Sequence, residues 1–185
     1  MGRTAKLRQR TCRDVRVAWK RLDSDAWRIR WRTSGFAAVS PVRGSPSRIA
    51  KLLVSRAEQG TKVRLALGDP DSEAVRRRGD EERIGDGLAA RVRLSLMYLR
   101  GAVGAPGVEL RFHATTLYNS IYRFDDDMLV NAHVYGAPAA HSPVLHLRRL
   151  PGGRLFDHYQ ASFERVWEQA SADNAPGMLA QGERR

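Results

Sequence analysis

The sequence has 185 residues, enough for one domain with a hydrophobic core and too few for two full-sized domains. It contains no apolar run long enough to span a membrane and no apolar segment behind its basic N-terminus, which argues against membrane and secreted proteins and favours the cytoplasm. Cys12 is the only cysteine, which excludes an internal disulfide and a cysteine-rich zinc site.

Basic residues give the sequence a net charge of +12, and arginine outnumbers lysine 28 to 4. Residues 1–34 hold 11 of the basic residues against 3 aspartates, which leaves a net charge of only +4 for residues 35–185. Arg and Lys contacts to phosphate give sequence-independent affinity for nucleic acid. Most of the excess charge lies outside the expected domain, however, and the arginine bias fits a GC-rich coding sequence. The charge therefore does not favour direct DNA binding by this chain.

Two terminal segments are expected to lie outside the domain. Residues 1–34 read as a basic extension, poorly ordered or weakly structured, in which tryptophans alternate with arginines. Residues 173–185 lack periodicity and are expected to be a flexible tail. The domain is therefore expected over residues 35–172.

The domain begins with a short strand, predicted by the small apolar run GFAAVSPVRG. Ser47 can cap the helix that follows, and Gly60 is a natural left-handed terminator for it. The next segment, KVRLALGDP, reads as a buried strand that Gly68 and Pro70 stop. A helix followed by such a strand suggests a crossover topology.

A second helical region is predicted after this strand. Apolar residues from Ile84 to Val103 recur at spacings of three and four, which indicates a long amphipathic helix weakened near its start by Gly85 and Gly87. The segment VELRFHA then alternates apolar and polar residues, as in a half-buried strand.

The last part of the domain predicts a hairpin, a strand and a helix. The runs LYNSIYRF and MLVNAHVYG flank three aspartates, Asp125–Asp127, as in an antiparallel hairpin with an acidic turn. PVLHLRR reads as a strand, and RLFDHYQASFERVWEQASAD as an amphipathic helix. The order of elements predicts an α/β domain with a mixed sheet flanked by helices.

The segment GDPDSEA follows the buried strand at the place where ligands bind in open α/β sheets. Asp69 and Asp71 could orient a polar ligand or a cation, and Ser72 with the following amides could bind an anion. Helix capping explains the same residues, and Asp and Ser prefer helix starts. Capping is the favoured interpretation.

The hairpin carries a denser concentration of polar and aromatic residues. Period-two alternation places Tyr118 and Tyr122 on one face of its first strand, and Asn119 and Arg123 on the other. Such residues suit the recognition of a ligand, although cross-strand aromatic pairs also stabilise a solvated sheet face. For the group as a whole we favour a ligand site, whose candidates are Arg111, His113, Tyr118, Asn119, Arg123, Asn131, His133 and Tyr135.

Several kinds of chemistry find no support. The five histidines show no tight paired spacing, which argues against a metal site. The sequence has no GxSxG, GxxxxGK or GxGxxG segment, so we expect no nucleotide or dinucleotide cofactor bound in those ways and, more generally, no cofactor.

The order of parts from KVRLALGDP to FDHYQASFERVWEQA resembles a single phospholipase D-like domain. More narrowly, LGDPDS, LYNSIYRFDDDMLVNAHVYG and PVLHLRR resemble the C-terminal domain of bacterial helix-turn-helix regulators of XRE type, over about residues 48–170. The resemblance implies a phospholipase D-like three-layer arrangement, a mixed sheet flanked by helices. It also implies that two domains pair in active members, so a homodimer is an expectation.

Active phospholipase D-like enzymes use a His-x-Lys motif with a downstream Asp. Here His113 is followed by Thr115 at the position of the Lys, and Ser120 stands at the position of the Asp. Without the lysine, charge developing on a phosphate loses a positioned cation. The resemblance therefore implies recognition rather than turnover at His113, with a small phosphorylated or nucleotide-like molecule as the ligand class.

Three functional hypotheses follow. The first is a non-catalytic ligand-sensing domain related to transcriptional regulators, in a chain whose residues 1–34 show no helix-turn-helix pattern. The second is a phosphodiesterase or nuclease with His113 as nucleophile, in which Arg111, Arg123 or His133 supplies the missing positive charge. The third is a nucleic-acid-binding protein that uses its basic N-terminal extension.

Overall fold

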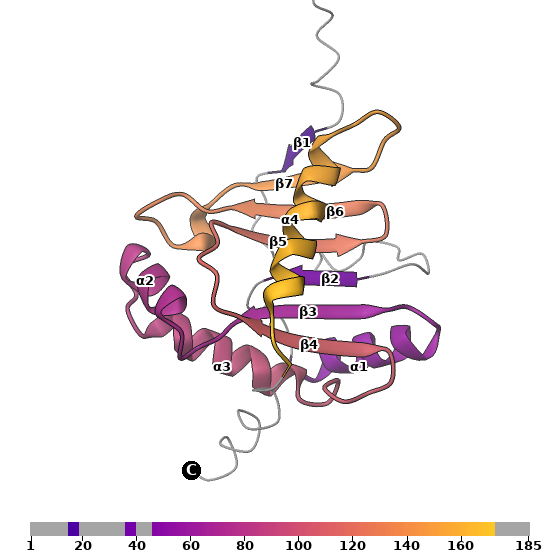
Figure 1. Ribbon diagram of the computed structural model, residues 1–185, viewed down its shortest axis with the longest axis horizontal. Coiled ribbons are helices and arrows are strands. Elements are labelled where there is room, and N and C mark those ends of the chain that lie inside the picture. Colours follow the sequence, from indigo (N-terminus) through magenta and orange to yellow (C-terminus); the bar gives the residue numbers. More distant parts are fainter. Residues whose placement is uncertain (1–14, 19–35, 40–45, 173–185) are drawn as a thin grey trace, which may run out of the picture.

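The computed structural model describes residues 15–18, 36–39 and 46–172, which form one mixed sheet with helices on both faces (Figure 1). The sheet has the order β1-β7-β6-β5-β2-β3-β4. Its central and lower strands β2, β3 and β4 are parallel, and every other pairing is antiparallel. The strands are β1 (Val15–Ala18), β2 (Phe36–Val39), β3 (Val63–Gly68), β4 (Val108–His113), β5 (Asn119–Phe124), β6 (Asp127–Ala132) and β7 (Val144–Arg148).

The helices complete a three-layer arrangement, as predicted. One layer contains α1 and α3, and α4 crosses the opposite face of the sheet, while α2 lies beside the end of β3 (Figure 1). A short 3-10 helix, η2, lies in the connection between β6 and β7. The bounds are α1 (Pro46–Glu58), α2 (Glu73–Glu81), α3 (Gly87–Leu99), η2 (Ala139–His141) and α4 (Leu155–Gln169).

Each face of the sheet has its own hydrophobic core because side chains alternate along the strands. Leu65 and Leu67 of β3 pack toward α1 and α3, and Ala66 between them packs toward α4. Full burial of one such leucine contributes about 1.5–3 kcal/mol. The predicted buried strand is therefore confirmed in β3, and the two cores fix the sheet between its helical layers.

Aromatic and guanidinium groups dock α4 on the sheet. The rings of Phe163 and Trp167 stack with centroids 5.8 Å apart, and the guanidinium of Arg64 lies 5.0 and 5.3 Å from them. Arg64 also donates two hydrogen bonds to Glu164 of the same helix, at 2.7 and 2.8 Å. Such planar pairs between Arg and a carboxylate fix geometry as well as charge.

The predicted long helix is wrong in its extent. Helix α3 begins at Gly87 and ends at Leu99, so Ile84 and Val103 lie in the turns on either side. Gly85 adopts a left-handed conformation, with φ of +48°, and separates α2 from α3. The predicted cap at Ser47 is also wrong, since Ser47 lies within α1, which begins at Pro46, where the fixed φ of proline suits the first helical position.

The two expected terminal segments are described only in part. Val15–Ala18, within the predicted extension, pairs with β7 as an edge strand of the sheet. The other residues before Phe36 and the tail from residue 173 onward lie outside the described residues. No helix in the described part of the chain is long and apolar enough to cross a membrane.

Candidate functional site

The strand directions bring most of the predicted site residues to one edge of the sheet. Strands β3, β4 and β6 end there, whereas β5 and β7 begin there (Figure 1). Helix α2 and the 133–143 connection lie at the same edge. We call this region the polar edge and define it by Asp69, His113, Tyr118, Asn131 and His133.

His113 is the last residue of β4 and is only 7% exposed. Its backbone carbonyl accepts the amide hydrogen of Asp69 at 2.8 Å, and its Nδ1 accepts the amide hydrogen of Thr115 at 3.3 Å. Burial lowers the pKa of His113 to about 4, against the weaker opposing effect of the negative charge of Asp69. The imidazole is therefore neutral at pH 7, and because Nδ1 accepts a hydrogen bond, Nε2 carries the proton.

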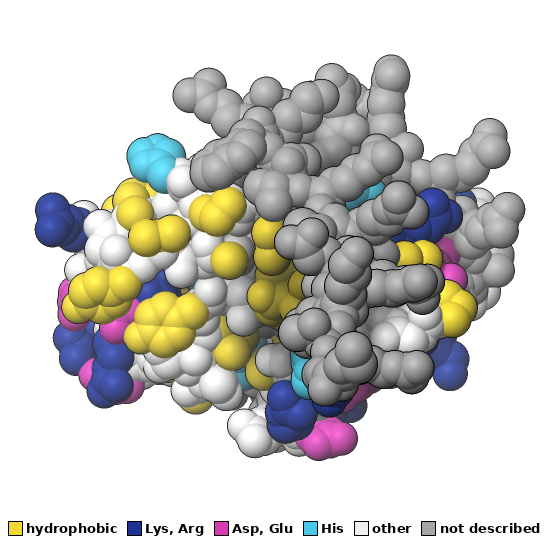
Figure 2. Space-filling model, turned by 90° about the horizontal axis from the view of Figure 1, so that it is seen from above, with side chains coloured by type: hydrophobic (Ala, Val, Ile, Leu, Met, Phe, Trp, Pro, Cys, Tyr) yellow, Lys and Arg dark blue, Asp and Glu magenta, His cyan; other side chains and the backbone are white. Residues whose placement is uncertain are grey.

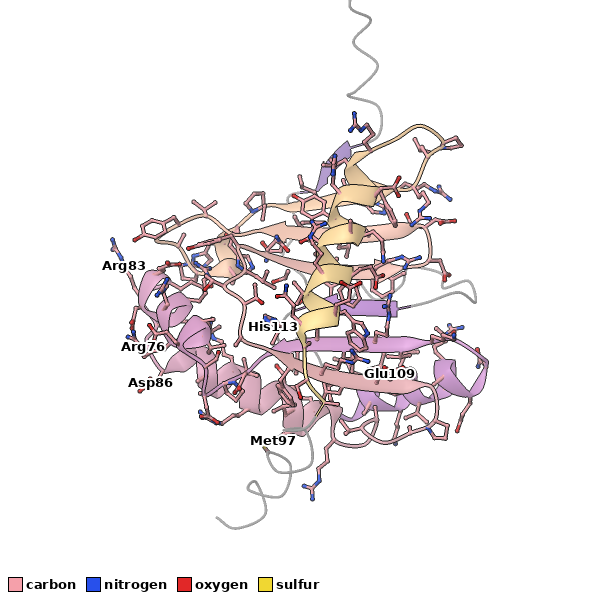
Figure 3. All side chains as sticks on the ribbon, viewed as in Figure 1. Arg76, Arg83, Asp86, Met97, Glu109 and His113 are labelled. Carbon is pink, nitrogen blue, oxygen red and sulfur yellow. The ribbon has the colours of Figure 1, made fainter. Side chains whose placement is uncertain are left out.

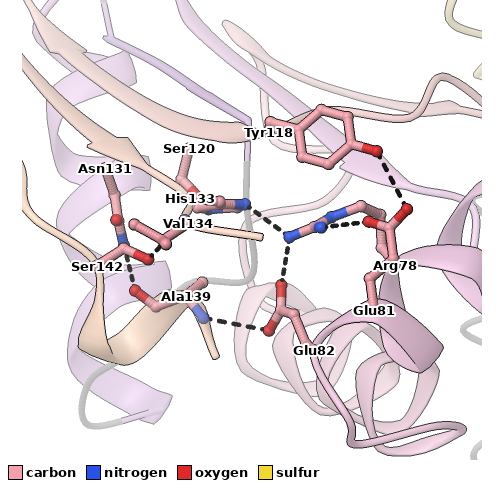
Figure 4. A network of polar contacts seen from close by, with 10 residues as sticks. All are labelled: Arg78, Glu81, Glu82, Tyr118, Ser120, Asn131, His133, Val134, Ala139 and Ser142. Atoms are coloured by element: carbon pink, nitrogen blue, oxygen red, sulfur yellow. Dashed lines mark hydrogen bonds and ion pairs between the residues drawn. The ribbon is translucent and has the colours of Figure 1, made fainter. Parts of the chain in front are cut away.

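A second polar cluster surrounds Arg78 of α2 (Figure 4). Arg78 is 4% exposed and donates to Glu81 at 2.6 Å and to Glu82 at 2.8 Å. The same guanidinium lies 3.3 Å from Nδ1 of His133 and 4.7 Å from the ring centroid of Tyr118. This cluster satisfies a buried cation with two carboxylates, which offsets much of the cost of its desolvation.

His133 joins α2 to the sheet through both ring nitrogens. Its Nδ1 faces the donor Arg78, so Nε2 carries the proton and donates to the hydroxyl of Ser120 at 2.9 Å. Burial, followed by the positive charge of Arg78, lowers the pKa of His133. Ser120, at the position of the Asp in the phospholipase D-like pattern, thus contacts His133.

The same cluster also holds the connection between β6 and β7 (Figure 4). Glu82 accepts the amide hydrogen of Ala139 at 3.2 Å, and the side-chain amide of Asn131 donates to the Ala139 carbonyl at 2.8 Å. Val134 donates its amide hydrogen to the hydroxyl of Ser142 at 3.1 Å. The side-chain oxygen of Asn131 is buried and has no hydrogen-bond partner among the described residues.

Two tyrosines form the exposed rim of the polar edge. Tyr118 is 46% exposed and donates its phenolic hydrogen to Glu81 at 3.1 Å. Its carbonyl accepts the amide hydrogen of His133 at 2.9 Å, which brings Val134 and the exposed Tyr135 beside it. Hydrophobic side chains gather on this left-hand side of the molecule in Figure 2. Asn119, at the start of β5, is half-buried.

Arg111 and Arg123 lie away from the polar edge, on the α4 face of the sheet. Arg111 donates to the carbonyl of Trp167 and its guanidinium lies 4.3 Å from the Trp167 ring centroid. Arg123 is at the opposite end of β5, where its Nε donates to the carbonyl of Asp125 at 2.8 Å. The structure therefore does not bring either arginine together with His133.

The GDPDS segment shows the favoured capping geometry. Ser72 accepts the amide hydrogen of Val75 and caps α2, and Asp69 accepts the amide hydrogen of Asp71 at 2.9 Å. The carboxylate of Asp71 forms an ion pair with Arg93. A groove of about 400 Å³ opens beside this segment, lined by Pro70, Asp71, Ser72, Glu73, Arg76, Asp86, Ala89 and Arg93. With three carboxylates against two guanidiniums, its charge does not favour an anion.

The residues that sequence reasoning missed are Arg78, Glu81 and Glu82. Their segment, RRRGDEER, reads as a solvated helix surface. Arg78 nevertheless falls three and four residues after the buried Val75 and Ala74, on the inner face of α2. This spacing from two buried apolar residues could have predicted that Arg78 is buried. Within the described residues no group of His, Cys, Asp and Glu is arranged to hold a metal ion.

Comparison with known proteins identifies the family. Residues 47–173 match a family described as a domain of unknown function, DUF5919. The chain belongs to DUF5919. In this DUF5919 member the matched region starts within α1 and continues past α4, so it contains every residue of the polar edge. No curated protein sequence matches the chain significantly.

Two solved structures are similar to this DUF5919 chain. TrmBL2, an archaeal chromatin protein that shows a novel mode of DNA binding, matches with a TM-score of 0.50 at 12% identity. That match covers 86% of this chain and 54% of TrmBL2, so the chain spans about half of that protein's length. Nuc from Salmonella typhimurium, a phospholipase D family member, matches with a TM-score of 0.44 at 15% identity, covering 75% of this chain and 81% of Nuc.

Proposed function

We propose that this DUF5919 chain is a non-catalytic ligand-sensing domain, related to those of helix-turn-helix transcriptional regulators. The observation that carries the proposal is the state of His113. A histidine nucleophile attacks through a ring nitrogen that has a free lone pair. In His113 the lone pair of the neutral ring is on Nδ1, which the Thr115 amide engages at 3.3 Å. Nε2 carries a proton and is no nucleophile.

Among the described residues, the surroundings of His113 also lack the cation that phosphoryl chemistry requires. Thr115 stands where the family pattern has its lysine, and the arginines proposed as substitutes are engaged elsewhere. Loss of one positioned electrostatic contact typically costs about a hundredfold to a thousandfold in rate. Both features support recognition over turnover.

The alternative, a phosphodiesterase or nuclease, is tested by incubating the full chain with a chromogenic phosphodiester. We expect no hydrolysis above that of buffer, and no difference between the wild-type chain and a His113→Ala variant. Hydrolysis that the wild-type chain catalyses and His113→Ala abolishes would establish the enzyme reading and overturn the proposal.

We propose that the ligand binds on the ring of Tyr118. The inner face of its ring rests on the Arg78 guanidinium, and its hydroxyl is fixed on Glu81, so the ring is held in place with little remaining freedom. The hydrogen bond to Glu81 raises the pKa of Tyr118, while the positive charges of Arg78 and Arg77 lower it. A stacking ring with a guanidinium beside it suits a nucleotide-like ligand.

Thermal unfolding of the full chain with AMP, adenosine or inorganic phosphate tests this surface. A ligand at 100 times its Kd stabilises by about 2.7 kcal/mol, a shift of a few degrees in Tm. We expect AMP to stabilise the wild-type chain and Tyr118→Phe, which keeps the ring, but not Tyr118→Leu. Tyr159→Phe, on α4, is the matched control. An absence of stabilisation by all three compounds, or an AMP effect that Tyr118→Leu preserves, would contradict the proposed site.

A further inference from the structure

Helix α3 is apolar on two opposite sides. Val92, Leu96 and Leu99 are buried against the sheet. On the other side Leu94 is 43% exposed and Met97 is 66% exposed. Figure 3 shows Met97 below α3. A surface helix ordinarily presents polar residues to solvent on the side away from its core.

The exposed apolar residues follow the geometry of one helix face. Ala90, Leu94 and Met97 are spaced by four and three residues, so they align along α3. All three are exposed. Aligned exposed apolar residues of this kind are typical of a surface that another element covers.

Positive charges outnumber negative ones along this face, on which Asp86 lies four residues before Ala90. Residues 87–100 contain no Asp or Glu, and Arg93 and Arg100 flank the apolar line on one side while Arg91 flanks it on the other. Arg93 forms an ion pair with Asp71, but both side chains are more than half exposed. Pairs of this kind contribute little, so another carboxylate could replace Asp71 at small cost.

We propose that the outer face of α3, defined as Ala90, Leu94 and Met97 with Arg91 and Arg93, docks an acidic amphipathic helix of a partner protein. Apolar residues of that helix cover Leu94 and Met97, and its carboxylates pair with the two arginines. A second copy of this chain fits less well. In an antiparallel pair of α3 helices Arg91 faces Arg100, and in a parallel pair in register each arginine faces its own copy.

Fluorescence anisotropy of a labelled peptide with the full chain tests the proposal. The probe is a helical peptide of about 18 residues, long enough to be helical in water, with leucines at helical spacing and glutamates elsewhere. A second peptide replaces every glutamate by lysine. We expect the acidic peptide to bind and the basic one not to bind. The double variant Leu94→Asp/Met97→Asp should weaken binding at least about tenfold, as expected for hot-spot residues.

The matched control is Leu150→Asp, an exposed leucine of similar exposure outside α3. Because Leu94 and Met97 are exposed, the double variant should keep the circular dichroism spectrum and Tm of the wild-type chain, which separates lost docking from lost folding. Equal binding of both peptides, no binding of the acidic one, or unchanged binding by a folded double variant would overturn the proposal. Self-association that Met97→Asp removes would assign this face to a second copy instead.

Discussion

At the scale of single residues, burial decides what the two central histidines can do. His113 and His133 both have pKa values below the ordinary range because desolvation disfavours the imidazolium. Both accept a hydrogen bond at Nδ1, one from a backbone amide and the other from Arg78. Neither is a proton carrier at pH 7, and both hold polar partners in place.

Protonation of His113 links its burial to stability. The folded-state pKa is about 4, whereas an exposed histidine titrates near 6.5, so between these values the unfolded chain binds the proton and the folded chain does not. This contribution to the free energy of unfolding is therefore present above about pH 6.5 and is lost as the pH falls toward 4. Its size is about 3 kcal/mol. Urea unfolding at several pH values measures it.

The matched variant is His113→Asn, whose side-chain carbonyl can accept the Thr115 amide hydrogen and does not titrate. We expect its free energy of unfolding to depend less steeply on pH between 4.5 and 6.5 than that of the wild-type chain, by roughly the His113 contribution. His133 remains in both proteins and gives a common background. Equal slopes in the two proteins would show that His113 titrates normally.

Some of these residues could be predicted from the sequence, and others could not. Alternation placed Tyr122 and Arg123 correctly on opposite faces of β5, because a pleated strand has a fixed period of two. It could not find Arg78, since whether a helical arginine is buried depends on what packs against it. The predicted polar face of the hairpin is part of a buried network. In it His133 contacts Arg78 of α2, and Asn131 contacts Ala139 in the 133–143 connection.

At the scale of secondary-structure elements, the turn between α2 and α3 decides the shape of the polar edge. The carbonyl of Gly79 accepts the amide hydrogens of Ile84 and Gly85, both at 2.9 Å, and folds the chain back on α2. Arg83 adopts a left-handed conformation, with φ of +57°, within this turn. Apolar spacing predicted one long helix because helical periodicity alone does not register such a reversal.

Gly79→Ala tests how closely Gly79 of α2 approaches the backbone of Gly85 in this turn. Alanine normally stabilises a helix by about 1 kcal/mol over glycine. At this position, however, a Cβ would overlap the backbone oxygen of Gly85, which cannot move without opening the turn. We expect a net loss of about 1–3 kcal/mol, as for overpacking in a core, measured by urea unfolding.

Gly87→Ala is the matched control, at the first residue of α3. Its Cβ would meet only the Ile84 side chain at 3.6 Å, an ordinary contact. We expect it to be neutral or slightly stabilising. Equal stability of Gly79→Ala and Gly87→Ala would show that Gly79 does not lie close to the backbone of Gly85.

At the scale of the whole molecule, one sheet separates two cores, and the chain order of its elements was predictable. Periodicity predicted β4 and α4 because each has one apolar side, whereas β2 and β3 were predicted from short apolar runs. The order of strands was not predicted, since it depends on long-range pairing. The pairing of β1 with β7 depends on such contacts, and Val15–Ala18 lies within the basic segment that was expected to be poorly ordered or weakly structured.

The core under α4 should be as necessary as the core under α1 and α3. Phe163 is almost completely buried and stacks on Trp167, so Phe163→Ala should lower the free energy of unfolding by about 3–5 kcal/mol. Leu155→Ala, at an exposed position of the same helix, should change it by less than about 0.5 kcal/mol. Similar effects of the two substitutions would show that α4 is not docked as described.

The proposed loss of catalysis depends most directly on His113, which carries its proton on Nε2 and cannot act as a nucleophile. Two-dimensional NMR that correlates the imidazole carbon-bound hydrogens with both ring nitrogens of ¹⁵N-labelled protein at pH 7 tests it directly, with His113→Asn to assign the signals. We predict a neutral His113 ring with a protonated Nε2 and an unprotonated Nδ1. A His113 ring that is charged at pH 7, or that carries its proton on Nδ1 and leaves Nε2 free to attack, would contradict the proposal that His113 is not a nucleophile.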